Sequence, residues 1–195
     1  LHSLTNYQCY KGIYSSFNSH NMFEIMNSLM RLFGPEDWTV CRGAHLLSFA
    51  DNHDVTRIAS IIDDERNLPL VYTLVFTMPG IPCVYYGSEW GAKGRKEEGD
   101  PALRVSFDKP VTNELTKHIS SLARIKSAYS ALNYGGLRIV VLTNGQCIFE
   151  RKFENKRIMV AFNMDDCDYT AHFDAGCGQA HELITGTIHD FGGGS

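Results

Sequence analysis

Asn52, His53 and Asp54 are the consecutive residues best suited to chemistry, and they follow the apolar run 46–49. An amide, an imidazole and a carboxylate can all hydrogen-bond a hydroxylated ligand, and the last two can also exchange a proton. Polar side chains at the carboxyl end of an apolar strand are typical of parallel α/β sheets. The segment therefore predicts a functional site at this edge of the sheet.

The same arrangement occurs again about thirty residues later. Apolar residues 81–86 run into Gly87, Ser88 and Glu89, and Trp90 follows. The carboxyl ends of neighbouring parallel strands meet at one edge of a sheet. The two segments are therefore expected to share one site.

The elements that must position these residues alternate between strand and helix. Apolar residues at helical spacing predict helices over 22–33, from about 55, over 68–78, and from 113 to about 125. Asn21 is the expected N-cap of the first helix and Asp54 of the second. Residues 1–19 show no helix or strand of their own. Helices that alternate with apolar strands indicate a parallel sheet.

The pattern changes after residue 132. Short strands separated by turn residues are expected over 137–143, 146–152, 157–163, 169–173 and 181–184. Asn144-Gly145 is a strong signal for a two-residue hairpin. We therefore expect a domain boundary near 133–136, with an antiparallel β-domain after it. Both ends of the chain look cut, which suggests a fragment.

Composition excludes several classes of partner. A formal charge of −4, with 22 acidic and 18 basic residues and no block of like charge, argues against nucleic acid and against an anionic membrane surface. No apolar run is long enough to span a bilayer. The six cysteines form no CxxC pair, so free thiols are expected. With no visible signal peptide, a cytoplasmic location is favoured.

No cofactor and no metal are expected. Asp51, His53 and Asp54 are the nearest approach to a cluster of metal ligands. Strand alternation would place Asp51 and His53 on one face and Asp54 on the other, which is a poor cage for an ion.

Two motifs together resemble the α-amylase family of glycoside hydrolases. They are FADNHD over 49–54 and GIPCVYYGSE over 80–89. Their order and spacing are specific, and the resemblance spans nearly the whole chain. Further matches are LTNY at 4–7, GDP at 99–101 with Arg104, LAR at 122–124 and ALNYG at 131–135.

The resemblance implies a fold. Residues 1–134 would form strands six to eight of a (β/α)8 TIM barrel with their helices, and 135–195 an antiparallel β-sandwich lacking its last strand. The function implied is a retaining hydrolase acting on α-glucosidic bonds of starch-derived oligosaccharides.

The resemblance also implies roles for the first motif. Asp54 would be the third family carboxylate, which stabilises a distorted, oxocarbenium-like transition state, and His53 would hydrogen-bond hydroxyls of the ring being cleaved. Asn52 is grouped with the substrate-binding residues. The bland alternatives are that Asp54 caps the following helix and that His53 is a satisfied core histidine.

Three further residues are candidate substrate contacts. Arg104 would pair with Asp100 or with a carboxylate near the site, although an exposed loop arginine is usually only solvated. Asp100 would contact a neighbouring sugar unit. Trp90 would stack on a sugar face, against the alternative of a packed loop tryptophan. Arg57 is interpreted as structural, and the charged loop 91–99 as a solvated rim.

The resemblance places the nucleophile and the acid/base carboxylate on barrel strands four and five, which this sequence does not contain. The isolated chain is therefore expected to be inactive, and to associate with the upstream barrel segment or with a second copy of itself. Alternatives are a family transglycosylase, a sugar isomerase and a non-catalytic carbohydrate-binding relative.

Overall fold

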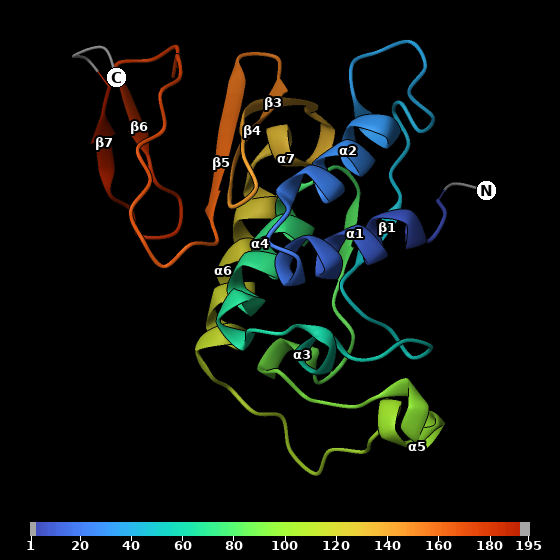
Figure 1. The fold of residues 1–195 in the computed structure, drawn as a ribbon. Helices are drawn as coiled ribbons and strands as arrows, with labels where there is room; N and C mark the ends of the chain where they lie inside the picture. The colour runs from blue at the N-terminus through green and yellow to red at the C-terminus, as the bar shows by residue number, and fades with distance from the viewer. Residues whose placement is uncertain (1–2, 192–195) are drawn as a thin grey trace.

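The computed structural model describes residues 3–191, and its longer helices lie mainly on one side of a short parallel sheet (Figure 1). The glycine-rich tail after residue 191, where a closing strand was expected to be missing, lies outside the described residues. The longer helices are α1 (Tyr7–Asn18), α2 (Met22–Phe33), α4 (Leu68–Thr77) and α6 (Glu114–Ala128). Shorter helical segments are α3 (Ile58–Ile61), η1 (Glu65–Asn67), η2 (Ser88–Trp90), η3 (Lys96–Glu98), α5 (Asp100–Leu103) and α7 (Ser130–Tyr134).

The parallel sheet consists of β1 (Leu47–Phe49) and β2 (Ile81–Cys83), as the alternating pattern predicted. A parallel bridge between Thr5 and Leu47 places the N-terminal segment on the other side of β1. The strand expected over 81–86 ends at Cys83, because the chain then turns to pack Tyr85 against a buried arginine. The three segments lie side by side in chain order.

Helix α2 has the bounds that the sequence predicted. The Asn21 side chain caps it by accepting a hydrogen bond from the Phe23 backbone N–H, and Gly34 ends it in an extended conformation before Pro35. Both signals act within one turn of the helix end, which is why sequence alone revealed them.

The expectation of no helix in residues 1–19 was wrong. Asn6 caps α1 by accepting a hydrogen bond from the Cys9 backbone N–H. Cys9, Ile13 and Phe17, spaced four residues apart, are buried on one face of the helix. Apart from Gln8 and Lys11, the remaining positions carry tyrosine, serine, asparagine and glycine, whose helix propensity is low, so packing decides the conformation here.

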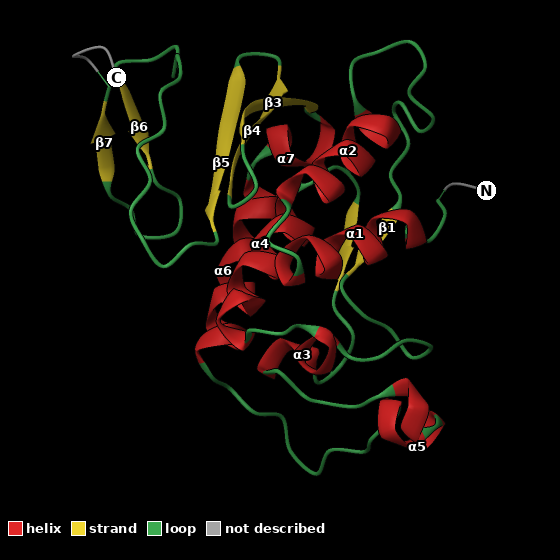
Figure 2. Cartoon of the chain, in the orientation of Figure 1, coloured by secondary structure: helices red, strands yellow, loops and turns green. Residues whose placement is uncertain are grey.

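The chain after residue 135 forms antiparallel strands (Figure 2). Three of them make one sheet in the order β3 (Gly136–Leu142), β4 (Gln146–Phe153) and β5 (Lys156–Asn163). A separate hairpin contains β6 (Gln179–His181) and β7 (Ile188–Asp190). The strand expected over 169–173 is irregular chain, and only His181 of the expected 181–184 is in a strand. Apolar alternation there is too short to overcome the surrounding turn residues.

Helices and sheet share one hydrophobic core. Ile25 and Leu29 of α2 belong to the same buried cluster as Leu137, Phe149 and Phe162 of the sheet. Among residues 3–191, this one cluster therefore has members on both sides of residue 135. Along residues 3–191, no helix combines the length and the apolar character needed to cross a lipid bilayer. All six cysteines carry free thiols.

Two buried cations lie where the helices meet the sheet. Arg151 donates to the carbonyls of Thr77 (2.6 Å) and Gly135 (2.8 Å), and Lys126 donates to the carbonyl of Leu132 (2.8 Å). Burial, assisted by the nearby Arg151 charge, lowers the pKa of Lys126 to about 7, and burial lowers the pKa of Arg151 to about 10. The helix-end carbonyls partly offset the cost of burying these charges.

Candidate functional site

Four ionisable side chains, those of His53, Asp54, Arg104 and Asp100, lie in a row beyond the carboxyl ends of β1 and β2, and we call them the charged cluster. His53 Nε2 is 3.2 Å from one carboxylate oxygen of Asp54, and Arg104 Nη2 is 3.6 Å from the other. The same Arg104 nitrogen is 3.6 Å from Asp100. The Asp54 side chain remains 51% exposed, so it is held from two sides and still accessible. The predicted pairing of Arg104 with Asp100 and with a site carboxylate is confirmed.

Strand alternation does not govern residues 51–54, because β1 ends at Phe49. His53 and Asp54 lie against each other, whereas Asp51 is 2% exposed and points into the interior. The expectation that His53 shares a face with Asp51 was therefore wrong. Within residues 3–191, no group of three or more His, Cys, Asp or Glu side chains is arranged to hold a metal ion.

Asn52 holds the backbone of the site. Its side-chain oxygen Oδ1 accepts a hydrogen bond from the Asp54 backbone N–H at 2.8 Å, and its side-chain nitrogen Nδ2 donates to the Tyr7 hydroxyl at 3.0 Å. Tyr7 is the first residue of α1, so Asn52 links the segment after β1 to that helix. These two bonds occupy both ends of the amide, which makes positioning its visible role.

Asp51 fastens together the two segments that follow the strands. One of its carboxylate oxygens accepts from the Ile58 backbone N–H (2.8 Å) and from the Ser88 hydroxyl (2.7 Å). Burial raises the pKa of Asp51, and the two hydrogen bonds oppose that rise. Asp51, rather than Asp54, therefore supplies the side-chain cap of the helix after β1. That helix begins at Ile58, not near residue 55 as expected.

Arg57 is the hub beneath the charged cluster, and it is fully buried. It donates to the carbonyls of Tyr86 (2.8 Å) and Leu103 (2.9 Å), and to the Ser88 hydroxyl (3.2 Å). Its guanidinium carbon lies 4.6 Å from the centre of the Tyr85 ring. The interpretation of Arg57 as structural is confirmed.

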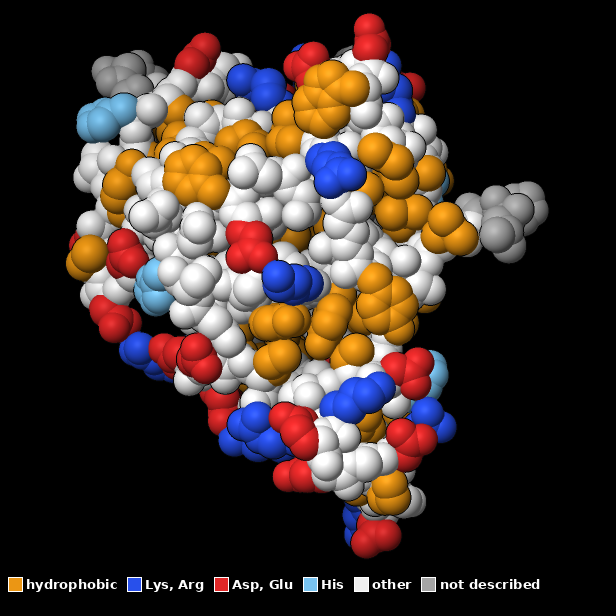
Figure 3. Space-filling model, turned by 45° about the vertical axis from the view of Figure 1, so that its right-hand side comes forward, with side chains coloured by type: hydrophobic (Ala, Val, Ile, Leu, Met, Phe, Trp, Pro, Cys, Tyr) orange, Lys and Arg blue, Asp and Glu red, His pale blue; other side chains and the backbone are white. Residues whose placement is uncertain are grey.

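The loop over 91–99 is bound to the site, so the expectation of a merely solvated rim was wrong for its backbone. The Lys96 amino group donates to the Asp54 carbonyl, and the Lys96 N–H donates to the Thr56 hydroxyl at 3.1 Å. The Gly94 N–H donates to Ser60 at 2.9 Å. Charged side chains of both signs gather at this end of the molecule (Figure 3).

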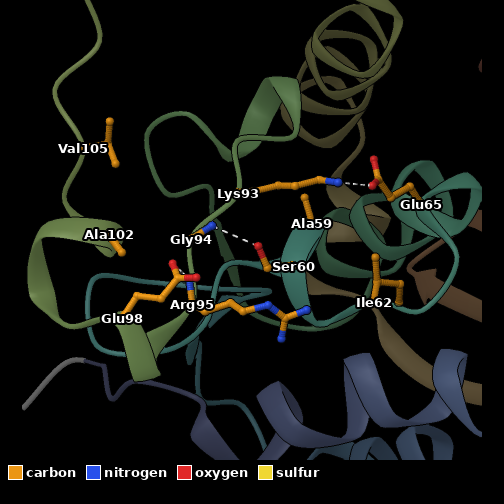
Figure 4. A pocket seen from close by; sticks show the side chains of 10 residues that line it. All are labelled: Ala59, Ser60, Ile62, Glu65, Lys93, Gly94, Arg95, Glu98, Ala102 and Val105. Atoms are coloured by element: carbon orange, nitrogen blue, oxygen red, sulfur yellow. Dashed lines mark hydrogen bonds and ion pairs between the residues drawn. The ribbon is translucent and has the colours of Figure 1, made fainter.

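A cavity of about 520 Å³ lies between this loop and α3 (Figure 4). The Lys93–Glu65 ion pair and the Gly94–Ser60 hydrogen bond join its walls. Ala102 of α5 also lines it. The cavity therefore adjoins the segments that carry Asp54 and Arg104.

Trp90 is not part of the charged cluster. It lies in η2, its ring centre is 5.2 Å from that of Phe107, and its carbonyl accepts from Asn113 at 3.0 Å. Its side chain is partly exposed. The structure thus brings Asn52, His53 and Asp54 together with Asp100 and Arg104, and places Trp90 on a neighbouring aromatic pair.

Sequence reasoning expected Tyr7 to orient the rim of the site, but it missed the supporting role of Asp51 and the contact between Tyr7 and Asn52. Asp51 was inside the first motif, and burial next to an apolar strand was the available signal. Tyr7 gave no local signal for its contact with Asn52, because the two residues are 45 positions apart.

Residues 14–159 match the family model described as "Alpha amylase, catalytic domain". The cyclomaltodextrin glucanotransferase of Bacillus sp. (strain 1011) is 32% identical over 117 residues, which are 60% of this chain and 16% of that protein. The alpha-amylase of Niallia circulans is also 32% identical over 117 residues, 60% of this chain and 22% of that protein. The chain thus spans less than a quarter of the length of these curated relatives.

Solved structures show the same fold. The Anoxybacillus alpha-amylase superimposes with a TM-score of 0.82 at 23% identity, covering 96% of this chain and 42% of that one. The alpha-amylase from Geobacillus thermoleovorans, complexed with acarbose, gives a TM-score of 0.80 at 18% identity, covering 95% and 43%. Nearly all of this chain is therefore accommodated within part of an α-amylase fold.

Proposed function

The chain belongs to the α-amylase family of glycoside hydrolases, and from this premise we propose that it supplies the wall of an α-glucan site that grips the sugar ring being cleaved. The observation that carries the proposal is the geometry of Asp54. Its carboxylate is held on one oxygen by His53 and on the other by Arg104, and it is half exposed at the carboxyl end of a parallel sheet.

A carboxylate in this position suits a transition-state role. It can accept hydrogen bonds from two ring hydroxyls, and each such charge-assisted bond contributes roughly 1.5–3 kcal/mol. If the bonds strengthen as the ring flattens toward the oxocarbenium ion, they raise the rate rather than ground-state binding. His53 would contact hydroxyls of the same sugar ring. Asn52 would hold the backbone turn that carries His53 and Asp54.

Asp100 and Arg104 extend the wall. Because Arg104 lies between Asp54 and Asp100, a glucan seated on Asp54 would place its neighbouring unit against Asp100. Trp90 would offer its exposed edge or face to a sugar at the rim of the site.

The proposed architecture follows from the strand order. The Thr5 segment, β1 and β2 would be strands six, seven and eight of a (β/α)8 barrel, and residues 135–195 would belong to the β-sandwich domain. Neighbouring segments in chain order, parallel register and intervening helices support the barrel assignment. The TM-scores to whole amylases support it as well.

The partner proposed is the upstream barrel segment or a second copy of the chain. Ile81 of β2 is 46% exposed. The buried Glu89 Oε2 has no hydrogen-bond partner among the described residues. A strand added at the free edge of β2 would cover Ile81 and could donate a hydrogen bond to Glu89 Oε2. Light scattering after size-exclusion should therefore show association, and a compact monomer at all concentrations would contradict this.

Binding tests the site directly. Maltoheptaose titrated into the chain should shift the NMR amide signals of His53, Asp54 and Arg104. Asp54→Asn, which keeps the size and removes the charge, should weaken this binding about tenfold. Asp108→Asn is the matched control and should leave it unchanged. Unchanged binding in Asp54→Asn would refute the proposal.

We expect that the 195-residue chain alone does not hydrolyse maltodextrin, because the resemblance places the nucleophile and the acid/base carboxylate on barrel strands four and five and the proposed assignment gives this chain strands six to eight. A retaining enzyme needs both, about 5–5.5 Å apart. Release of reducing sugar in proportion to the concentration of pure chain would overturn this expectation.

Transfer is the second candidate reaction for the whole protein. It is favoured by the 32% identity to a protein named cyclomaltodextrin glucanotransferase. Product analysis of the full-length protein with maltoheptaose separates the two reactions. Longer or cyclic glucans indicate transfer, and shorter linear glucans indicate hydrolysis.

A further inference from the structure

A groove of about 550 Å³ lies at the opposite end of the parallel strands from the charged cluster. His45, two residues before β1, and Gly80, directly before β2, form one wall. Tyr134 of α7 and Lys152 of β4 form the other. We call this the junction groove, because it lies between the helices and the three-stranded sheet.

An exposed aromatic ring lines the junction groove. Tyr134 is 64% exposed, although it belongs to a helix that is otherwise packed on the core. The His45 ring lies edge-on to it at 5.9 Å, and the Phe153 ring is 5.6 Å away on another side. The neighbouring rings hold Tyr134 in place and leave much of its surface to solvent.

Uncommitted polar groups surround this ring. The Tyr134 hydroxyl, the His45 ring nitrogens and the Lys152 amino group make no hydrogen bond to other residues in the range 3–191. Of the other cations that line the groove, Arg138 pairs with Glu150 at 3.1 Å, Arg42 pairs with Asp37 at 3.5 Å, and Arg151 donates to backbone carbonyls. The Tyr134 hydroxyl, the His45 ring and the Lys152 amino group are therefore the hydrogen-bonding groups that the groove offers to a ligand.

The floor of the junction groove is open. A Cβ added at Gly136 would meet nothing within 4 Å, whereas one added at the adjacent Gly135 would lie 2.2 Å from the Ala131 carbonyl oxygen. Gly135 is thus needed for packing, and Gly136 leaves free space in the groove. That space can be filled by substitution without a clash.

We propose that the junction groove is a second binding site for α-glucan, with a glucose unit stacked on Tyr134. A pyranose ring has an apolar C–H face and a rim of hydroxyls, which fits an aromatic surface bordered by hydrogen-bonding groups. The choice of α-glucan rests on the proposed function. Two sites on one chain would raise the affinity for long glucans by increasing the effective concentration of the second contact.

The test is an NMR titration of the whole chain with maltoheptaose, carried out in the wild type and in Asp54→Asn. Amides of His45, Tyr134 and Gly136 should shift in both proteins. Tyr134→Ala and Gly136→Leu should each weaken these shifts about tenfold, the first by removing the ring and the second by filling the groove.

Tyr169→Ala is the control, since Tyr169 is an exposed tyrosine outside the groove. It should leave the titration unchanged, and matching urea midpoints will show that each variant is folded. Shifts at the groove without shifts at Asp54 would uphold this inference and refute the proposed function. Shifts at Asp54 alone, no shifts at all, or wild-type titration of both groove variants would overturn the inference.

Discussion

Arg57 donates a hydrogen bond to the carbonyl of Leu103, the residue directly before Arg104. The buried guanidinium therefore fixes the backbone that carries the cation of the charged cluster. Arg57 also donates to the Tyr86 carbonyl and the Ser88 hydroxyl. One side chain therefore joins the segment after β1 to the segment after β2 and to α5. The accessible Asp54–Arg104 pair depends on an inaccessible residue.

Arg57→Met should destabilise the chain by about 3 kcal/mol, because it leaves buried carbonyls without their donor. Arg57→Lys should retain little of this stability, since one ammonium group cannot reach all three acceptors of the guanidinium. Urea unfolding measures the loss. Arg124→Met, on the exposed face of α6, should change stability by no more than about 0.5 kcal/mol. Equal midpoints for Arg57→Met and wild type would contradict the role of Arg57 as a hub.

Asp51→Asn and Asp51→Ala should differ. The amide keeps an oxygen that can accept from Ile58 and Ser88, and it removes a charge whose burial raises the carboxyl pKa. Alanine removes the helix cap and leaves a buried N–H unsatisfied, at a cost of about 2 kcal/mol. Differential scanning calorimetry should therefore place Asp51→Asn near wild type and Asp51→Ala well below it. The reverse order would show that the charge itself is required.

Stability should rise with pH between about 7 and 8.5 because of Lys126. Its pKa is lowered to about 7 in the folded chain from 10.5, so the unfolded chain binds more protons across this window. The free-energy cost of burying the charged Lys126 side chain is fully present below pH 7, and it is progressively removed above pH 7 as the folded chain loses this proton. Lys126→Met should flatten the rise, and Lys117→Met on the same helix should not. Urea midpoints at pH 7.0 and 8.5 measure the pH dependence of stability in both variants. The same change in midpoint for wild type and Lys126→Met would contradict the lowered pKa of Lys126.

Gly94→Ala should destabilise the loop beside Asp54, because the new Cβ would lie 2.2 Å from the Ala102 carbonyl oxygen. The expected cost is about 1–3 kcal/mol. Gly136→Ala adds the same methyl group into open space and should be close to neutral. Thermal unfolding of the two variants compares them directly, and an unaffected Gly94→Ala would show that the loop can move away without loss.

The sequence predicted features whose cause is local or carried by a motif. Asn21 and Gly34 bound their helix through contacts within one turn. The family resemblance led to the expectation that Arg104 pairs with Asp100 or with a carboxylate near the site, and in the structure it lies near both Asp100 and Asp54.

The features that could not be predicted depend on contacts between distant segments. Both Asp51 and Asp54 are suitable helix caps by type, and only the path of the chain after β1 brings Asp51 to Ile58. Helix α1 forms because its apolar face meets α2, not because its residues favour helix. The strand expected over 169–173 had the right alternation, but no strand between residues 3 and 191 pairs with it.

The shared core of α2 and the three-stranded sheet limits how the chain can be divided. Leu137 and Phe149 are buried in the same cluster as Ile25. A cut at Gly135 would expose apolar surface on both products, so neither piece should survive as a stable species after limited proteolysis. For the same reason, the three-stranded sheet cannot rotate as a rigid body relative to the helices. A displacement of the sheet would also displace α2.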